Sequence, residues 1–385
     1  MKKPIYNGKP ISTLDALSKA LGTNLSRLRI FIDTAENSYT TFTLEKKVNG
    51  IVVKERTLNE PKKNLKDLQK RINQAIFNNV SYPEYLQGGI KGKDFITNSK
   101  NHLSAKSLIN LDIKDFYPSI SIHHVYAIYN KLFKFPHTVS DALVKLTTKN
   151  GVVTQGGCCS SYIANLIFFN SEHDLVQKLE SRSLTYTRLI DDITISSAKP
   201  MSKDEITNTI NLTNNHLTKF NLNLNRDKTN IDHHHNKSDN FEVTGLWVRH
   251  GKPKVKSAVR RQIRQLVFKC KIQYELCPTD KSYHDLWNKT SGKVAILTRL
   301  GHANSKIYRK KLSEILPLYD IKKEEKIERI INYLIDTESK EINSPRRIKL
   351  YHKMIYHCGI LGRSNKSKAK LLKNKLKAKF IAVQV

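Results

Sequence analysis

The sequence predicts an α+β fold built on a small antiparallel sheet with helices packed against it. Two apolar, β-branched runs, SLINLD at 107–112 and YTRLIDDITIS at 186–196, are typical of buried strands. The chain order of strand, long helix and hairpin is that of a split βαβ unit. At 385 residues the chain is too long for one compact core, so we expect two or three packed units.

The first hundred residues predict helices around a β-hairpin. Ser12 or Thr13 can cap the first helix, and Asn49–Gly50 favours a tight turn between two strands. The expected elements are a helical region at 10–30, strands at 39–47 and 51–58, an amphipathic helix at 64–77 with Leu65, Leu68, Ile72 and Ile76 on one side, and a loop at 85–102.

The middle of the chain predicts the sheet, and its last third predicts helices. The expected elements are a strand and turn at 107–120, a small-residue loop becoming a long helix over 155–179, strands at 185–197 and 228–235, a helix at 203–220, and the segments 241–248 and 252–257 flanking a turn. From Val259 onward the pattern is almost entirely helical and basic.

The charge of the chain indicates a polyanionic partner. Its 67 basic and 34 acidic residues give +33. Residues 251–385 hold 33 Lys and Arg against 11 Asp and Glu, a net +22, so the excess is concentrated there. Nucleic acid is the first choice. A membrane surface is the competing partner, but the chain has neither a long apolar run nor an apolar stretch after its basic first ten residues, so we expect no membrane.

The cysteines indicate a reduced protein. Five are present, none in a CxxC pair, and Cys158 and Cys159 are adjacent. This usage predicts a cytoplasmic protein without structural zinc.

Acidic residues in two predicted strands form the candidate site. Asp191 and Asp192 lie within an apolar run, where an unpaired carboxylate would cost several kcal/mol, and strand alternation would send them to opposite faces. Asp112 follows the earlier strand. If the strands are neighbours, the carboxylates converge and suit two Mg²⁺ ions in a phosphoryl transfer. Asp pairs also cap turns or pair with Arg, and the pair alone would be weak support.

Six motifs in order make the chain resemble the reverse transcriptases of bacterial retrons and related defence-associated enzymes. LDIKDFYPSI resembles their first catalytic motif, TQGGCCSSYIAN their nucleotide-pocket loop and YTRLIDDITIS their YxDD strand. NLNLNRDKT resembles the lysine motif, FEVTGLWV the VTG motif and NSKNH the NAxxH motif. Leu189 stands where the family has Tyr, and Gly157, Cys158 and Ser161 replace the usual Ala and prolines of the pocket loop.

The resemblance implies a right-hand polymerase fold. Its expected parts are an N-terminal helix and fingers at 1–105, a palm at 106–250 with a fingers insertion at about 130–153, and a basic helical thumb and RNA-binding region at 251–385. The family further implies Asp112 and Asp191 as principal metal ligands, Asp192 as a supporting carboxylate, and the Ile113 carbonyl as a further ligand of two Mg²⁺ ions. Lys228 would donate a proton to pyrophosphate; the alternative is a solvated lysine.

Nucleotide-pocket residues also follow from the resemblance. Tyr117 falls where the family places an aromatic gate against a ribose 2′-hydroxyl, which implies dNTP substrates. Gln155 and Gly156 would line the pocket. Two pairs of cations compete for the triphosphate, namely Lys47 and Arg56 beside the hairpin turn, and Lys91 and Lys93 in the glycine-rich loop.

The implied function is an RNA-directed DNA polymerase that copies a structured noncoding RNA into DNA, in antiphage defence. RNA recognition would use Asn98 and His102 together with Val243, Thr244 and Gly245, and Tyr351, Tyr356 and Phe380 of the basic region could stack on bases. A partner effector protein or a homo-oligomer is a further expectation, and the primer is left open between an RNA 2′-hydroxyl, a protein tyrosine and a 3′ end. The alternatives are a noncatalytic RNA-binding scaffold and a group II intron-type maturase.

Overall fold

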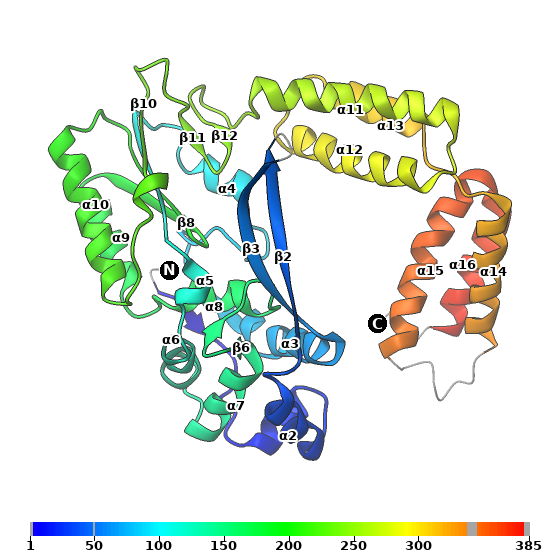
Figure 1. Cartoon of the computed structure of the whole chain (residues 1–385), viewed down its shortest axis with the longest axis horizontal. Helices are drawn as coiled ribbons and strands as arrows, with labels where there is room; N and C mark the ends of the chain where they lie inside the picture. Colours follow the sequence, from blue (N-terminus) through cyan, green and yellow to red (C-terminus); the bar gives the residue numbers. More distant parts are fainter. Residues whose placement is uncertain (1–2, 49–50, 337–344, 381–385) are drawn as a thin grey trace. The chain divides into compact units, whose positions relative to one another are not determined.

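A computed structural model describes residues 3–48, 51–336 and 345–380 as a mixture of helices and strands (Figure 1). The chain forms two compact units, 1–254 and 255–385. Within the described ranges, none of the helices combines the length and the apolar character that are needed to cross a bilayer.

The first unit begins with helices and a long hairpin. Its early elements are β1 (Ile5–Tyr6), α1 (Leu14–Ala20), α2 (Leu25–Thr34), β2 (Tyr39–Val48), β3 (Ile51–Pro61), α3 (Lys63–Ala75), η1 (Phe77–Asn79), β4 (Val80–Ser81) and α4 (Phe95–Lys100). Of the two predicted capping residues, Thr13 caps α1, because its side chain accepts a hydrogen bond from the Ala16 amide. The expected pairing of β2 with β3 is confirmed, whereas Asn49–Gly50 lies outside the described residues.

A four-stranded antiparallel sheet in the order β10–β5–β9–β8 lies at the centre of the first unit. Its strands are β5 (Ser107–Asp112), β8 (Leu184–Leu189), β9 (Asp192–Ser197) and β10 (Asn230–His233). The other elements of this region are α5 (Phe116–Ser119), α6 (Ile122–Ala127), η2 (Ile128–Leu132), α7 (His137–Thr147), β6 (Thr148–Lys149), β7 (Val152–Val153), α8 (Ser160–Leu166), α9 (Glu172–Glu180), α10 (Lys203–Thr218), η3 (Arg226–Lys228), β11 (Glu242–Val243) and β12 (Leu246–Trp247).

One large core joins the sheet to the early helices. Ile109, Leu111, Ile193 and Ile195 of the sheet belong to the same buried cluster as the apolar face of α3. The predicted face of that helix is confirmed, because Leu65, Leu68, Ile72 and Ile76 are all buried. Burying each such side chain contributes about 1.5–3 kcal/mol.

The single long helix predicted over 155–179 is wrong. The chain forms α8 and α9 with a break between them. Asn170 and Ser171 stand at the break, and both residue types favour turns and caps over helix interiors. The break gives Glu172 a place at the start of α9, where its side chain is buried.

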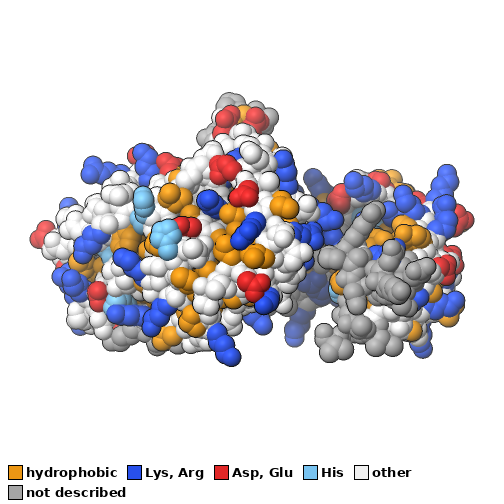
Figure 2. Space-filling model, turned by 90° about the horizontal axis from the view of Figure 1, so that it is seen from below, with side chains coloured by type: hydrophobic (Ala, Val, Ile, Leu, Met, Phe, Trp, Pro, Cys, Tyr) orange, Lys and Arg blue, Asp and Glu red, His pale blue; other side chains and the backbone are white. Residues whose placement is uncertain are grey.

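The second unit consists of helices, as predicted: α11 (Ser257–Leu276), α12 (Lys281–Arg299), α13 (Ser305–Glu314), α14 (Ile321–Ile335), α15 (Pro345–Ser364) and α16 (Lys366–Lys379). Tyr351 and Phe380 are buried and stack on each other with ring centroids 4.8 Å apart, so they form core and the expectation that they stack on bases is wrong. Tyr356 is 56% exposed. On the face seen in Figure 2, Lys and Arg side chains are spread widely over the surface.

Candidate active site

The aspartate pair lies at the tip of a hairpin. β8 and β9 pair as far as Leu189 opposite Asp192, which leaves Ile190 and Asp191 as a two-residue turn. The expected mid-strand position is therefore wrong for Asp191, and Asp192 is the first residue of β9. Ile190 has φ +61°, a left-handed conformation that a β-branched residue rarely adopts and that costs about 1–3 kcal/mol.

The two acidic strands are neighbours in the sheet, as predicted. β5 pairs with β9, and its last residue, Asp112, stands opposite Asp192. The Ile113 amide donates a hydrogen bond to the Asp191 carbonyl over 3.0 Å. All three acids therefore lie at one end of the sheet, beside the backbone of Ile113.

Lys228 is the direct partner of Asp112. Its Nζ lies 2.6 Å from Oδ1 and 2.7 Å from Oδ2 of that carboxylate, and the Asn225 side-chain amide donates to Oδ1 over 3.3 Å. The Asp112 side chain is 10% exposed and the Lys228 side chain 45% exposed. Lys228 is thus an oriented cation at the site, and the alternative of a lysine surrounded only by solvent does not describe it.

Burial and neighbouring negative charge raise the pKa of both Asp191 and Asp192. Loss of surrounding water, followed by the charges of Asp191 and Asp112, raises the pKa of Asp192 to about 6. Burial also raises the pKa of Asp191, and the negative charge of Asp112 adds to that effect. Crowded carboxylates of this kind favour a cation at the same place.

The donor set fits a hard divalent cation, because carboxylate and carbonyl oxygens are the ligands that Mg²⁺ prefers. Within residues 3–48, 51–336 and 345–380, no three acidic, His or Cys side chains converge closely enough to complete such a site. Asp112 is held by Lys228 instead. Asp112, Asp191 and Asp192 are nevertheless the residues that could hold a metal here.

A cavity of about 460 Å³ opens beside these acids. Seven predicted site residues line it, from β3, β5, α5, the pocket loop, the hairpin turn and η3: Arg56, Asp112, Ile113, Tyr117, Gln155, Asp191 and Lys228. Asp192, Gly156, Lys91 and Lys93 are not among the described residues that line it, and the Lys47 side chain lies outside the described part of the structure.

Tyr117 stands close to the hairpin turn. Burial raises the pKa of Tyr117 to about 12, and the negative charge of Asp191 adds to that effect. The phenol is therefore protonated at neutral pH, and its ring forms one wall of the cavity. An aromatic wall next to the acids can limit the shape of what binds.

The pocket loop is fastened to β3. The Asn59 amide donates to the Gln155 carbonyl over 2.9 Å. Gly156 has φ +110°, and a Cβ there would lie 3.2 Å from the Asn59 carbonyl oxygen, so glycine permits this close approach. Arg56 of the same strand thereby lies on the cavity wall together with Gln155.

The glycine-rich loop supports the hairpin turn. A Cβ at Gly88 would lie 2.8 Å from Cγ1 of Ile190, so the loop backbone packs directly on the strained residue. Lys93 forms an ion pair with Glu84 at 3.0 Å, and Lys91 is exposed. The structure therefore brings Arg56, and neither of these two lysines, to the cavity.

A buried ion pair behind the turn was not predicted from the sequence. Arg188 is fully buried, its Nε and Nη2 lie 2.6 and 2.8 Å from the two carboxylate oxygens of Glu172, and its Nη1 donates to the Ile190 carbonyl over 3.0 Å. Burial alone would lower the pKa of Arg188, but the charge and hydrogen bonds of Glu172, with the smaller contributions of Tyr186 and Tyr85, together outweigh burial and raise the pKa. The sequence does carry one signal of this pair, namely a single arginine within an apolar strand. A charge that is buried in such a strand requires a partner.

The predicted RNA-binding residues fall into buried and exposed groups. His102 is fully buried, with ring nitrogens 2.7 Å from Ser196 Oγ and 2.8 Å from Thr187 Oγ1, and Asn98 is also fully buried. Burial lowers the pKa of His102 to about 3. These contacts hold α4 against the sheet, and neither side chain is accessible to RNA.

The second RNA-binding motif forms a tight hairpin. Val243 is buried, whereas Thr244 and Gly245, at φ +46° and +81°, form the two-residue turn between β11 and β12. Thr244 Oγ1 donates to the Phe95 carbonyl over 3.2 Å, which joins this turn to α4. Gly245 is exposed.

Comparison with known proteins agrees with this geometry. The family model described as reverse transcriptase (RNA-dependent DNA polymerase) matches residues 45–248. The chain is 44% identical to the retron Se72 reverse transcriptase of Salmonella heidelberg, over 98% of this chain and 99% of that protein. It is 29% identical to the retron Ec48 reverse transcriptase of Escherichia coli, over 80% of this chain and 77% of that protein.

The fold is thus that of a reverse transcriptase, an RNA-directed DNA polymerase. The chain belongs to the retron reverse transcriptases. Members of this family copy a noncoding RNA into DNA, and reverse transcriptases use divalent metal ions. A maturase or a scaffold without activity is therefore not the function of this chain.

Proposed function

We propose that DNA synthesis takes place in the cavity between the hairpin turn and β3, at two Mg²⁺ ions held by Asp112, Asp191, Asp192 and the Ile113 carbonyl. When bound, such ions stabilise the attacking and leaving oxygens of an in-line phosphoryl transfer. The observation that carries this proposal is the register of Asp112 opposite Asp192, with Asp191 in the adjoining turn.

Lys228 serves two roles in this proposal. Its ammonium neutralises Asp112 in the structure without ligands. During catalysis it donates a proton toward the leaving pyrophosphate, a role that suits a lysine beside developing negative charge. The position of Lys228 on the cavity wall, with a side chain that is 45% exposed, supports this assignment.

The incoming dNTP occupies the same cavity. Tyr117 packs on the deoxyribose and excludes a 2′-hydroxyl. Gln155 lines the same cavity, and Gly156 holds the neighbouring loop backbone close to Asn59. Arg56 binds the triphosphate, because a guanidinium suits bidentate phosphate contact and this arginine lines the cavity. Lys47 remains a second candidate for the triphosphate, and the positions of Lys91 and Lys93 make them weaker candidates.

The parts of a right hand are proposed at the positions expected from the sequence. Residues 1–105 with the insertion at about 130–153 form fingers, 106–250 form the palm and 251–385 form the thumb. The acidic ends of β5 and β9 within 106–250 support the palm assignment. The helices of the second unit and the positive charge of its sequence support a thumb that holds duplex by its phosphates.

The cognate RNA is recognised by the exposed β11–β12 turn and the basic second unit. Thr244 and Gly245 are the contacting residues, and Thr244 is joined to Phe95 of α4. Asn98, His102 and Val243 are buried and do not contact the RNA directly. RNA is read mainly through shape, loops and 2′-hydroxyls, so a rigid turn of this kind is a suitable element.

The wider setting is proposed from the family and the cysteines. All five cysteines are free, which is in keeping with the reduced cytoplasm of a bacterium. We place the enzyme in antiphage defence together with an effector protein or further copies of itself. Deleting the gene or substituting Asp191 should remove protection in a plaque assay if defence requires the DNA product.

Primer extension with the co-purified RNA tests the metal site. Asp191→Asn should abolish DNA synthesis with Mg²⁺ and labelled dNTPs while RNA still co-purifies, because the change removes a charge without removing volume. Asp204→Asn, at an exposed position on α10, is the matched control and should retain activity. Undiminished synthesis by Asp191→Asn would refute the metal assignment.

A further inference from the structure

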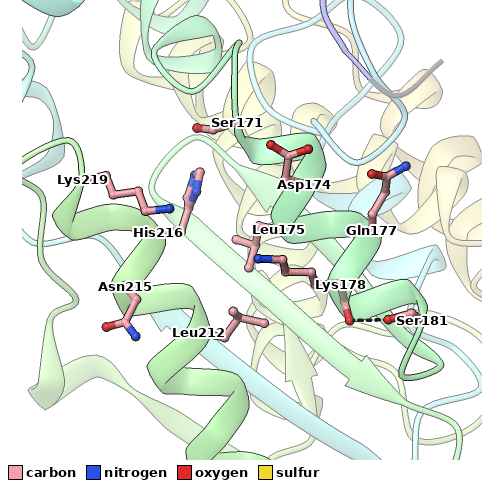
Figure 3. A pocket seen from close by; sticks show the side chains of 10 residues that line it. All are labelled: Ser171, Asp174, Leu175, Gln177, Lys178, Ser181, Leu212, Asn215, His216 and Lys219. Atoms are coloured by element: carbon pink, nitrogen blue, oxygen red, sulfur yellow. Dashed lines mark hydrogen bonds between the residues drawn. The ribbon is translucent and has the colours of Figure 1, made fainter.

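A second groove lies between α9 and α10 (Figure 3). Its volume is about 460 Å³, and it shares no lining residue with the active-site cavity. The groove is lined by Ser171, Asp174, Leu175, Gln177, Lys178, Ser181, Leu212, Asn215, His216 and Lys219. The proposed catalytic roles use none of these residues.

The floor of the groove carries two polar atoms without partners. Among the described residues, neither Ser171 Oγ nor His216 Nε2 has a hydrogen-bond partner, and both atoms are buried. His216 is only 7% exposed. A buried polar atom without a hydrogen bond costs about 1–3 kcal/mol, so a ligand that satisfied both atoms would gain that free energy.

The remaining floor is apolar, and the rim is cationic. Leu175 is buried and Leu212 half-buried, so together they offer an apolar surface. Lys178 of α9 and Lys219 beyond the end of α10 stand on the two walls, and Figure 3 shows Lys219 extending toward His216. Asp174 is the one carboxylate of this lining, and it lies 2.9 Å from His173 Nε2. Two lysines against one aspartate give the lining a net positive charge.

We propose that the α9–α10 groove binds the phosphate group of a nucleotide, with Lys178 and Lys219 as its cationic contacts and Ser171 and His216 as hydrogen-bond donors on the floor. The leucines provide a surface for the attached sugar or base. The nucleotide is either one unit of the bound RNA or a free nucleotide, since both present the same phosphate chemistry.

The imidazole can act in this way without carrying a charge. Burial, together with the charges of Arg188 and Lys219, lowers the pKa of His216 to about 4, whereas the charges of Glu172 and Asp174 act in the opposite direction. His216 is therefore neutral at pH 7. A neutral ring can donate from Nε2 to a phosphate oxygen in one tautomer.

The first experiment measures RNA affinity as a function of salt concentration. The variants are the double Lys178→Ala/Lys219→Ala and the single His216→Phe, which keeps a ring between Phe168 and Phe220 but removes Nε2. If the phosphate belongs to RNA, the slope of log K against log salt should fall by roughly 0.7–0.9 for each lysine removed. His216→Phe should weaken RNA binding. Lys203→Ala, an exposed lysine on α10 outside the groove, is the matched control.

The second experiment measures binding of 5′-AMP by calorimetry to the same proteins. Loss of AMP binding in the double variant and in His216→Phe, with an unchanged RNA slope, would assign the groove to a free nucleotide. Primer extension at saturating RNA and thermal unfolding should remain at the wild-type level in each variant. RNA and AMP binding equal to those of Lys203→Ala would overturn the proposal. The proposal would also be overturned if the double lysine variant weakened binding while His216→Phe did not. That result would indicate an effect of surface charge alone.

Discussion

Replacing Arg188 by Met tests whether the buried ion pair positions the catalytic turn. The Arg188 and Glu172 side chains are 0% and 3% exposed, so the substitution leaves a buried carboxylate whose remaining donor in this network is the Tyr186 hydroxyl, at 2.8 Å. Breaking a buried pair from one side costs about 3–5 kcal/mol. The substitution also removes the donor to the Ile190 carbonyl, which holds the strained turn before Asp191.

The double variant Arg188→Met/Glu172→Met separates stability from positioning. Replacing both charges by apolar side chains of similar size is often close to neutral. Tyr186 then loses its acceptor, so we expect the double variant to lose about 1–3 kcal/mol, less than Arg188→Met alone. Activity should not return with stability, because the Ile190 carbonyl still lacks its donor. A displacement of the reacting groups by about 1 Å can cost about 100-fold in rate.

The stability of the first unit can be followed through one tryptophan. The chain has two, Trp247 and Trp287, and a Trp287→Phe background restricts fluorescence to the first unit. Urea midpoints would be compared with kcat from primer extension at saturating dNTP. Arg182→Met, at an exposed arginine, should change stability by less than about 0.5 kcal/mol. A cost below about 1 kcal/mol for Arg188→Met, or full recovery of kcat in the double variant, would refute a positioning role for this ion pair.

Three further outcomes are expected. Tyr117→Ala should raise rNTP incorporation relative to dNTP by about 10- to 100-fold, because the cavity loses its aromatic wall; an unchanged ratio in competitive primer extension would place the gate elsewhere. Protons compete with the metal for Asp192, whose pKa is raised to about 6, so activity at limiting Mg²⁺ should fall as pH drops through 6 and recover with added Mg²⁺. The pKa of His102 is about 3 in the folded protein and 6.5 when exposed, so below pH 6.5 the unfolded chain binds a proton that the folded protein does not. The free energy of unfolding should therefore fall as pH drops below 6.5. The urea midpoint of His102→Gln should fall less over the same pH range than that of the wild type.

The sequence was sufficient to predict the two acidic strands, β5 and β9, but not the turn at Ile190 and Asp191 that joins β8 to β9. Apolar, β-branched residues on both sides of the aspartates predict a continuous strand, and Ile190 is a poor candidate for a left-handed turn residue. Its conformation is imposed by tertiary contacts, namely the Arg188 hydrogen bond and the packing of Gly88. Local sequence cannot reveal such contacts, because their partners are distant in the chain. The same holds for Asn98 and His102, whose burial depends on where α4 docks.

The pocket loop shows how this chain manages without the usual prolines. Prolines stabilise a loop mainly by restricting the unfolded chain. Here the folded loop is fixed by α3, because Gln69 Oε1 accepts from the Cys158 amide over 2.9 Å and the Asn73 side-chain amide donates to the Cys158 carbonyl over 2.8 Å. Gln69 is itself fully buried and donates to the Leu146 carbonyl at 2.9 Å. Each such bond contributes about 0.5–1.5 kcal/mol, comparable to the effect of a proline. The loop is therefore held in place from α3 and β3, and a sequence without prolines does not imply a mobile nucleotide pocket.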